Sequence, residues 1–121
     1  MPARRPLSFP KSRRLTCASE FECVRREGLA HHGGLLILGV LAAKEIHGFR
    51  AGFVTARRLG GAVVRNRVRR RLREIVRRHQ EEIIDAQWIV TIARAKAARA
   101  SYRQLEDEWL RLAKRAFILA S

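Results

Sequence analysis

The feature that most constrains this chain is a basic segment near its middle, residues 57–78, which contains ten Arg and one Glu. Within GAVVRNRVRRRLREIVRRH (residues 61–79), the apolar side chains recur every three or four positions, at Val64, Val68, Leu72, Ile75 and Val76. This spacing places them on one stripe of an α-helix. We therefore predict a helix from about Ala62 to His79, with one face packed on a core and the other face covered by guanidinium groups.

The opposite face of this helix favours binding to phosphates. It carries Asn66, Arg70, Arg73 and Arg77, with Arg69 beside them and with Arg65 and Arg67 in the first turn. A solvated helix face normally mixes charge signs, whereas Glu74 is the only acid here. The planar fork of Arg suits bidentate phosphate contacts, and the first turn of a helix attracts anions. These residues are predicted to bind the phosphate backbone of RNA or DNA.

Length and composition fit one globular domain with a polyanionic partner. The chain has 121 residues, is 47% hydrophobic, and carries a formal net charge of +15. Its longest nearly apolar run, residues 35–43, is far shorter than the roughly 20 residues of a membrane span. The helix stripe lacks the Trp or Phe anchor of a membrane-surface helix. We expect no membrane partner.

The N-terminal region predicts a cytoplasmic protein. Residues 1–13 contain three Pro and several basic residues, which predicts an irregular basic arm ahead of a single domain at residues 14–119. The arm has no apolar segment of a secretion signal, although its Arg-rich, acid-poor start leaves an organelle transit peptide open. Two Cys are too few for a disulfide scaffold, so we expect reduced thiols.

The rest of the pattern predicts a mixed α and β domain in the order α, several β, α, β, α. Ser19 and Glu22 have the spacing of a capping box for a first helix that ends at Gly28. Apolar runs bounded by Gly predict strands at residues 35–41 and 49–55, and the apolar run WIVTIA predicts a further strand at residues 88–93. Ser101 and Gln104 form a second capping box, which begins a helix with an apolar stripe that includes Trp109.

The residues give no sign of a protein active site. A protein nuclease needs clustered carboxylates or a poised His pair, but the acids at residues 81–82 and 106–108 fit solvated or helix N-terminal charges. The four His lack metal-ligand spacing, so we predict no metal on protein side chains. Two alternatives remain: a structural RNA-binding protein, such as a ribosomal protein or RNA chaperone, and a DNA-binding module. The near absence of base-reading side chains disfavours the DNA-binding module.

Several ordered motifs resemble the protein subunit of bacterial ribonuclease P. The central one is GFVTARRLGGAVVRNRVRRRLRE (residues 52–74), in which Arg65, Asn66 and Arg67 match the family's R-N-R triplet. FPKSRRLTCASEF (residues 9–21) is similar to the entry into the family's first helix, and WIVTIARAKA (residues 88–97) to its last strand. Together these motifs cover most of residues 7–117.

The resemblance implies a fold and a division of labour. The fold is α+β in two layers, ordered αβββαβα, with a mixed sheet and a left-handed crossover, and it is shared with a ribosomal protein domain. The family's RNA subunit requires Mg²⁺ and removes the 5′ leader of precursor tRNA by hydrolysis. The protein, expected as one copy per RNA, binds ribonuclease P RNA through the R-N-R helix. It holds the leader between the first helix and the sheet, and alone it is expected to be inactive.

The resemblance also assigns residues to the two RNAs. The RNA-binding set is Arg65, Asn66, Arg67, Arg69, Arg70, Arg73 and Arg77. The set for the leader or tRNA is Phe21, Arg25, Thr55, Arg57 and Arg58. Three positions depart from the family pattern. Arg25 stands where the family often has an aromatic residue, Gly39 where some members have one, and Gly61 where some members have Asn.

Overall fold

In the computed structural model, which describes residues 14–43 and 48–120, the strands form one four-stranded mixed sheet in the order β1-β2-β4-β3. β1 (Leu29–His32) pairs antiparallel with β2 (Leu36–Ala42), and β2 pairs antiparallel with β4 (Gln87–Ala93). β3 (Phe49–Val54) lies parallel to β4. The predicted order αβββαβα is confirmed, while the predicted arm at residues 1–13 lies outside the described residues.

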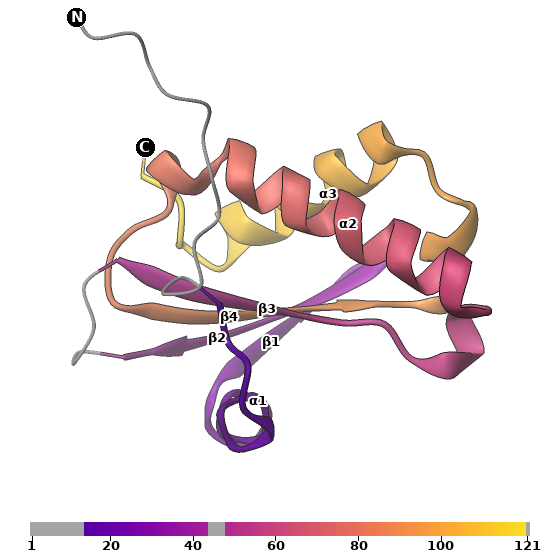
Figure 1. Cartoon of the computed structure of the whole chain (residues 1–121). Helices are drawn as coiled ribbons and strands as arrows, with labels where there is room; N and C mark the ends of the chain where they lie inside the picture. Colours follow the sequence, from indigo (N-terminus) through magenta and orange to yellow (C-terminus); the bar gives the residue numbers. More distant parts are fainter. Residues whose placement is uncertain (1–13, 44–47, 121) are drawn as a thin grey trace, which may run out of the picture.

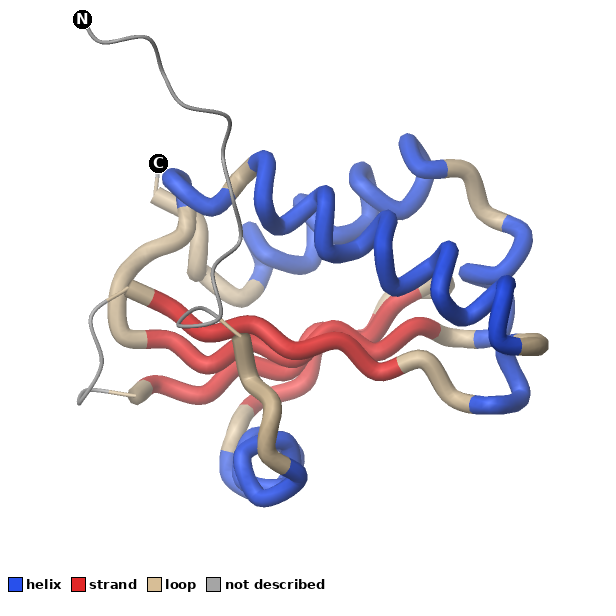
Figure 2. Tube along the Cα trace, in the orientation of Figure 1, coloured by secondary structure: helices blue, strands red, loops and turns tan. Residues whose placement is uncertain are grey.

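Helices cover both faces of the sheet. α2 (Ala62–Arg78) connects the parallel neighbours β3 and β4, and it lies beside α3 (Tyr102–Arg115) on one face, while α1 (Ala18–Glu27) lies on the other (Figures 1 and 2). Short 3₁₀ turns, η2 (Arg57–Leu59), η3 (Gln80–Glu82) and η4 (Ala95–Arg99), flank α2 and β4.

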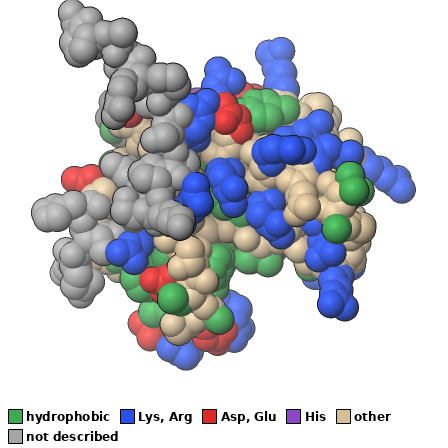
Figure 3. Space-filling view, viewed as in Figure 1, with side chains coloured by type: hydrophobic (Ala, Val, Ile, Leu, Met, Phe, Trp, Pro, Cys, Tyr) green, Lys and Arg blue, Asp and Glu red, His purple; other side chains and the backbone are tan. Residues whose placement is uncertain are grey.

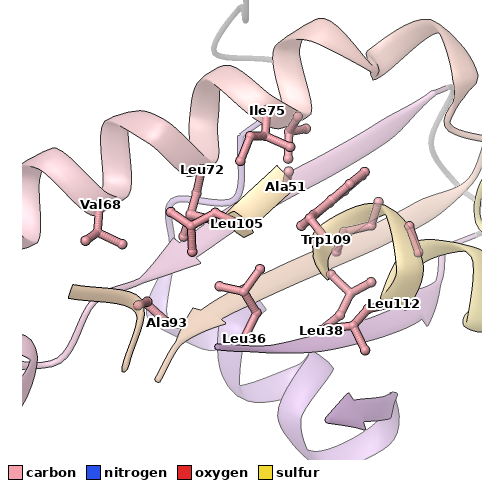
Figure 4. Packing of buried hydrophobic residues seen from close by; sticks show 14 of the residues in the cluster. Leu36, Leu38, Ala51, Val68, Leu72, Ile75, Ala93, Leu105, Trp109 and Leu112 are labelled. Atoms are coloured by element: carbon pink, nitrogen blue, oxygen red, sulfur yellow. The ribbon is translucent and has the colours of Figure 1, made fainter. Parts of the chain in front are cut away.

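The main core lies between the sheet and the α2–α3 layer. Leu72 and Ile75 of α2 and Trp109 of α3 point toward side chains of the sheet (Figure 4). Trp109 is fully buried, and its indole N–H donates to Thr91 Oγ1 at 3.1 Å. The apolar stripe of α2 is therefore confirmed, because Val68, Leu72, Ile75 and Val76 are all buried.

A second, smaller cluster lies on the opposite face, under α1. Leu15, Val24 and Val90 form its buried centre, with Phe21 and Trp88 packed against it. Trp88 is only half-buried, because the alternation along β4 points it toward this thinner layer.

The start of α1 differs from the prediction. Cys17, rather than Ser19, is the N-cap, and Glu20 accepts hydrogen bonds from the N–H groups of Thr16 and Cys17, both at 3.1 Å. The reason is tertiary: Leu15 is buried and its N–H donates to Ala51 O of β3 at 3.0 Å, which fixes where the chain enters the helix. The helix end at Gly28 is confirmed, with its N–H on Val24 O at 2.8 Å.

Two further features were not anticipated. The residue pattern gave no strand at residues 29–32, where β1 forms a mostly exposed edge. The Ser101–Gln104 capping box is confirmed, but Glu108 was wrongly expected among solvated or N-terminal charges. Its carboxylate is buried and accepts from the N–H groups of Leu35 and Leu36 at 2.6 and 2.7 Å, so it caps the start of β2.

Candidate nucleic-acid interface

The outer surface of α2 carries the seven predicted RNA-binding residues, which we call the arginine face: Arg65, Asn66, Arg67, Arg69, Arg70, Arg73 and Arg77. Its position follows from the anchored stripe on the other side of the helix, since burying one face of α2 leaves the other outward. Lys and Arg side chains gather along α2 in the space-filling view (Figure 3). Asn66 and Arg70 are exposed, and the remaining five are half-buried.

Some guanidinium groups of α2 also hold the fold together. Arg67 donates to Ala98 O at 3.1 Å, and Arg71 donates to Ala100 O at 3.0 Å. Both carbonyls belong to the η4 region, so these two side chains fasten it to α2. Arg77 donates to both carboxylate oxygens of Glu74, and this pairing raises the pKa of Arg77. These arginines therefore combine a structural role with any contact to a partner.

Arg73 and Arg69 line a small cavity, which we call the arginine pocket. It has a volume of about 200 Å³ and lies between α2, β3 and the segment before α1, with Arg14 and Phe21 also in its wall and no carboxylate among its lining residues. Burial lowers the pKa of the Arg73 guanidinium, and the positive charges of Arg14 and Arg69 lower it further. Such a concentration of positive charge favours an anion with several acceptor oxygens.

A larger, mostly apolar groove runs between α1 and the sheet, and we call it the α1 groove. It has a volume of about 580 Å³, and its walls include Phe21, Val24, Phe53, Val90 and Ile92. Phe21 reaches across to β3 because Gly52 has no side chain: a Cβ there would lie 2.4 Å from Cζ of the Phe21 ring. Phe21 thus lines both the α1 groove and the arginine pocket.

The other predicted leader residues lie at the rim of the α1 groove or beside it. Arg25 and Thr55 line the groove. Arg25 donates to both oxygens of Glu22, at 3.1 Å through Nε and 2.5 Å through NH2, which holds its guanidinium against α1. Arg57 and Arg58 follow Thr55 on η2 and are exposed. The structure therefore places Phe21, Arg25 and Thr55 in the α1 groove, and Arg57 and Arg58 on η2 directly after β3.

Sequence reasoning missed part of the surface. Phe53 lines the α1 groove, and Arg58 shares a third hollow of about 620 Å³ with Arg94 and Lys96. The sequence does contain a local signal for Arg94 and Lys96, because it has no acidic residue between Asp85 and Glu106. No local pattern indicated Phe53, since an apolar residue in a strand is equally typical of a core.

Residues 14–43 and 48–120 contain no group of three or more His, Cys, Asp or Glu side chains that could hold a metal ion. In the same ranges, no helix is long and apolar enough to cross a membrane. What the surface presents is positive charge beside an aromatic-lined groove.

Arginine forks suit the phosphate backbone, and an apolar groove with aromatic walls suits unpaired bases. On a small α+β domain, this combination is typical of the class of nucleic-acid-binding proteins. A family model described as Ribonuclease P matches residues 9–117. The chain belongs to this family, as its protein component.

Relatives and solved structures agree with this assignment. The ribonuclease P protein component of Roseiflexus castenholzii is 41% identical over 107 residues, covering 88% of this chain and 87% of the relative. That of Syntrophomonas wolfei is 32% identical and covers 91% and 92%. The Staphylococcus aureus RNase P protein superimposes with a TM-score of 0.85 at 28% identity, covering 90% of this chain and 99% of that one. The Thermotoga maritima protein gives a TM-score of 0.77 at 28% identity, covering 84% and 96%. The family match favours this assignment over a ribosomal protein or RNA chaperone.

Proposed function

We propose that the chain binds ribonuclease P RNA through the arginine face and holds the 5′ leader of precursor tRNA in the α1 groove. The RNA subunit would hydrolyse the phosphodiester between leader and tRNA, and the protein would position the substrate. The observation that carries this proposal is the continuity of the two surfaces: Phe21 lines the α1 groove and also the arginine pocket formed by Arg69 and Arg73.

The chemistry of each surface suits its proposed RNA. Folded RNA presents phosphates to Arg70 and its neighbours on α2, and such contacts give affinity without sequence readout. An unpaired leader can stack a base on Phe21 while Arg57 and Arg58 bind its phosphates. The Arg25 guanidinium, which Glu22 holds in place, offers a flat cationic surface where other family members often have an aromatic ring.

Mg²⁺ belongs to the RNA subunit in this proposal. The protein contributes guanidinium groups, which neutralise phosphate and reduce the concentration of cations that the RNAs need to approach one another. We propose one protein per RNA and a cytoplasmic location, where both proposed RNA partners are present. Sedimentation of the reconstituted complex measures the stoichiometry, and a mass matching two proteins per RNA would contradict it.

Reconstituted cleavage tests the function. The purified chain is mixed with a bacterial ribonuclease P RNA at low Mg²⁺, and a 5′-labelled precursor tRNA is followed over time. We expect leader release only when both components are present, with none from the protein alone even at high Mg²⁺. Tight RNA binding without any support of cleavage would contradict the proposal.

A further inference from the structure

Thr55 stands at the end of β3, where the α1 groove meets α2. Its side chain is 8% exposed, and its Oγ1 accepts a hydrogen bond from Arg69 at 2.5 Å. Arg69 also donates to Asn66 Oδ1 at 3.0 Å. A single guanidinium therefore joins the wall of the α1 groove to the R-N-R triplet.

The Thr55 hydroxyl has a proton to donate as well. A hydroxyl both accepts and donates, and here the accepting side is occupied by Arg69. Among residues 14–43 and 48–120, no hydrogen bond uses Thr55 as the donor. Accepting from a cation polarises the O–H bond and strengthens its donor. Thr55 is thus a strengthened donor at the wall of the groove.

The other polar side chains around the α1 groove lie at its exposed rim and pair with one another. Its lining is aliphatic and aromatic apart from Glu22, Arg25 and Thr55, and Glu22 and Arg25 bind one another. A nucleobase buried among apolar walls still has ring nitrogens or carbonyl oxygens at its edge, and leaving them unpaired is unfavourable. Thr55, at 8% exposed, is the buried polar side chain of the lining whose donor can pair with such an acceptor.

The charges around Thr55 fit the backbone of the same nucleotide. Arg57 and Arg58 follow within three residues and are exposed on η2. Phosphates would therefore lie outside the groove, against η2, and the base would enter the apolar space lined by Phe21 and Phe53. A base edge, rather than a phosphate, would then reach Thr55.

We propose that Thr55, positioned by Arg69, donates a hydrogen bond to an acceptor on the base of one unpaired nucleotide, and so makes the α1 groove selective at one leader position. Arg69 acts here as a positioning residue. The inference rests on the proposed function, because it takes the leader as the occupant of the groove.

The test uses the reconstituted complex of this chain with ribonuclease P RNA. Thr55→Val removes the hydroxyl and keeps the shape, and Thr55→Ser keeps the hydroxyl as the matched control. We expect Thr55→Val to weaken precursor tRNA binding about fivefold, which corresponds to one lost hydrogen bond, and to leave mature tRNA unchanged. Thr55→Ser should bind both like the original protein. Should Thr55→Val fail to fold, Thr55→Ala carries the same comparison.

Substituting one leader nucleotide at a time identifies the contacted position and distinguishes its base from its ribose. An abasic nucleotide is placed at each leader position in turn, and at one position the effect of Thr55→Val should disappear because the base is missing. A 2′-deoxy series is the second arm. Loss of the effect only with a 2′-deoxy nucleotide would overturn the assignment to a base, since the acceptor would then be the ribose hydroxyl.

Two further outcomes would overturn the inference: equal weakening of precursor and mature tRNA, or unchanged binding of both by Thr55→Val. These are distinguishable from failure of the proposed function. If the proposed function itself were wrong, the unsubstituted chain would show no preference for precursor over mature tRNA.

Discussion

Glu108 accepts hydrogen bonds from two backbone N–H groups of another element while only 5% exposed, and Arg111 donates to its other oxygen at 3.0 Å. Gly33 comes so close that an added Cβ would lie 2.3 Å from Glu108 Oε2. Glu108, which the sequence pattern places among solvated or helix N-terminal charges, is therefore a buried hydrogen-bond acceptor that stabilises the fold. Its neighbour Asp107, one position away on α3, is exposed.

Replacing Glu108 with Ala is expected to destabilise the protein by about 3 kcal/mol, because the N–H groups of Leu35 and Leu36 lose their acceptor on burial. Urea unfolding of the isolated protein measures this difference. Asp107→Ala is the matched control: it changes the net charge equally and should shift stability by less than about 0.5 kcal/mol. Equal losses in the two variants would show that charge, rather than the cap, is responsible.

His79 gives the fold a pH dependence. Burial against Trp109 lowers its pKa, but hydrogen bonds to Glu106 at 2.9 Å and Glu82 at 3.0 Å outweigh this, and the pKa is raised above its usual 6.5. A raised pKa in the folded state means that protonated His79 favours folding. Its contribution is fully present below the unfolded pKa of about 6.5 and is lost as the pH rises through the folded value.

We therefore expect the stability difference between the original protein and His79→Gln to be larger at mildly acidic than at alkaline pH. Urea unfolding across this range measures it, and the lowest pH should keep Glu82 and Glu106 ionised. A His79→Gln difference that is constant with pH would contradict the linkage.

A substitution at Phe21 can distinguish stacking on an RNA base from packing within the protein. Its ring lies over Gly52, so Phe21→Leu keeps much of the buried bulk while removing the aromatic face. Because stacking of a base on an aromatic ring contributes about 1–3 kcal/mol, we expect this variant to bind precursor tRNA about tenfold more weakly and mature tRNA unchanged. Equal weakening of both RNAs in the binding assay would make Phe21 a core residue only.

At the scale of the element, α2 divides its arginines between two tasks. Arg67 and Arg71 bind carbonyls of the η4 region, whereas Arg70 is exposed and has no partner among the described residues. The two tasks fall on different sides of one helix because 3.6 residues complete each turn. Loss of Arg70 should weaken RNA binding alone, whereas loss of Arg67, which belongs to the arginine face and also binds the η4 region, should weaken RNA binding and lower stability.

Arg70→Ala is expected to lower the slope of log affinity against log salt concentration by about one, as loss of one phosphate contact should. Its urea midpoint should stay unchanged, whereas Arg67→Ala should lower the midpoint because the bond to Ala98 O is lost. Binding to ribonuclease P RNA across a salt series measures the slope. Arg103→Ala, at an exposed position of α3, is the control, and a slope change equal to that of Arg70→Ala would indicate a general charge effect.

At the scale of the whole molecule, what could be predicted from the sequence depended on how local each cause was. The bounds of α2 and its two faces follow from its own periodicity, and the structure confirms them. The start of α1 could not be predicted from a local pattern, because it depends on the hydrogen bond from Leu15 to β3. The role of Glu108 depends on residues more than 70 positions away in the sequence. The α1 groove likewise requires β3 and β4 to lie beneath α1, so Phe53 could not be distinguished from a core residue.

The charge of the whole molecule predicts that anions stabilise it. A net charge of +15, with the guanidiniums of Arg14 and Arg69 repelling that of Arg73, opposes the folded state, and an anion bound there relieves that repulsion. An anion at ten times its Kd should raise the Tm by about 5 °C, since binding to the folded state alone shifts the equilibrium.

Thermal unfolding in low-millimolar sulfate, against chloride at equal ionic strength, measures this shift below the range where sulfate acts by exclusion from the surface. The Arg73→Ala variant, which removes one guanidinium from the arginine pocket, should show a smaller shift. Identical Tm values in the two salts would mean that general screening, rather than a bound anion, relieves the repulsion.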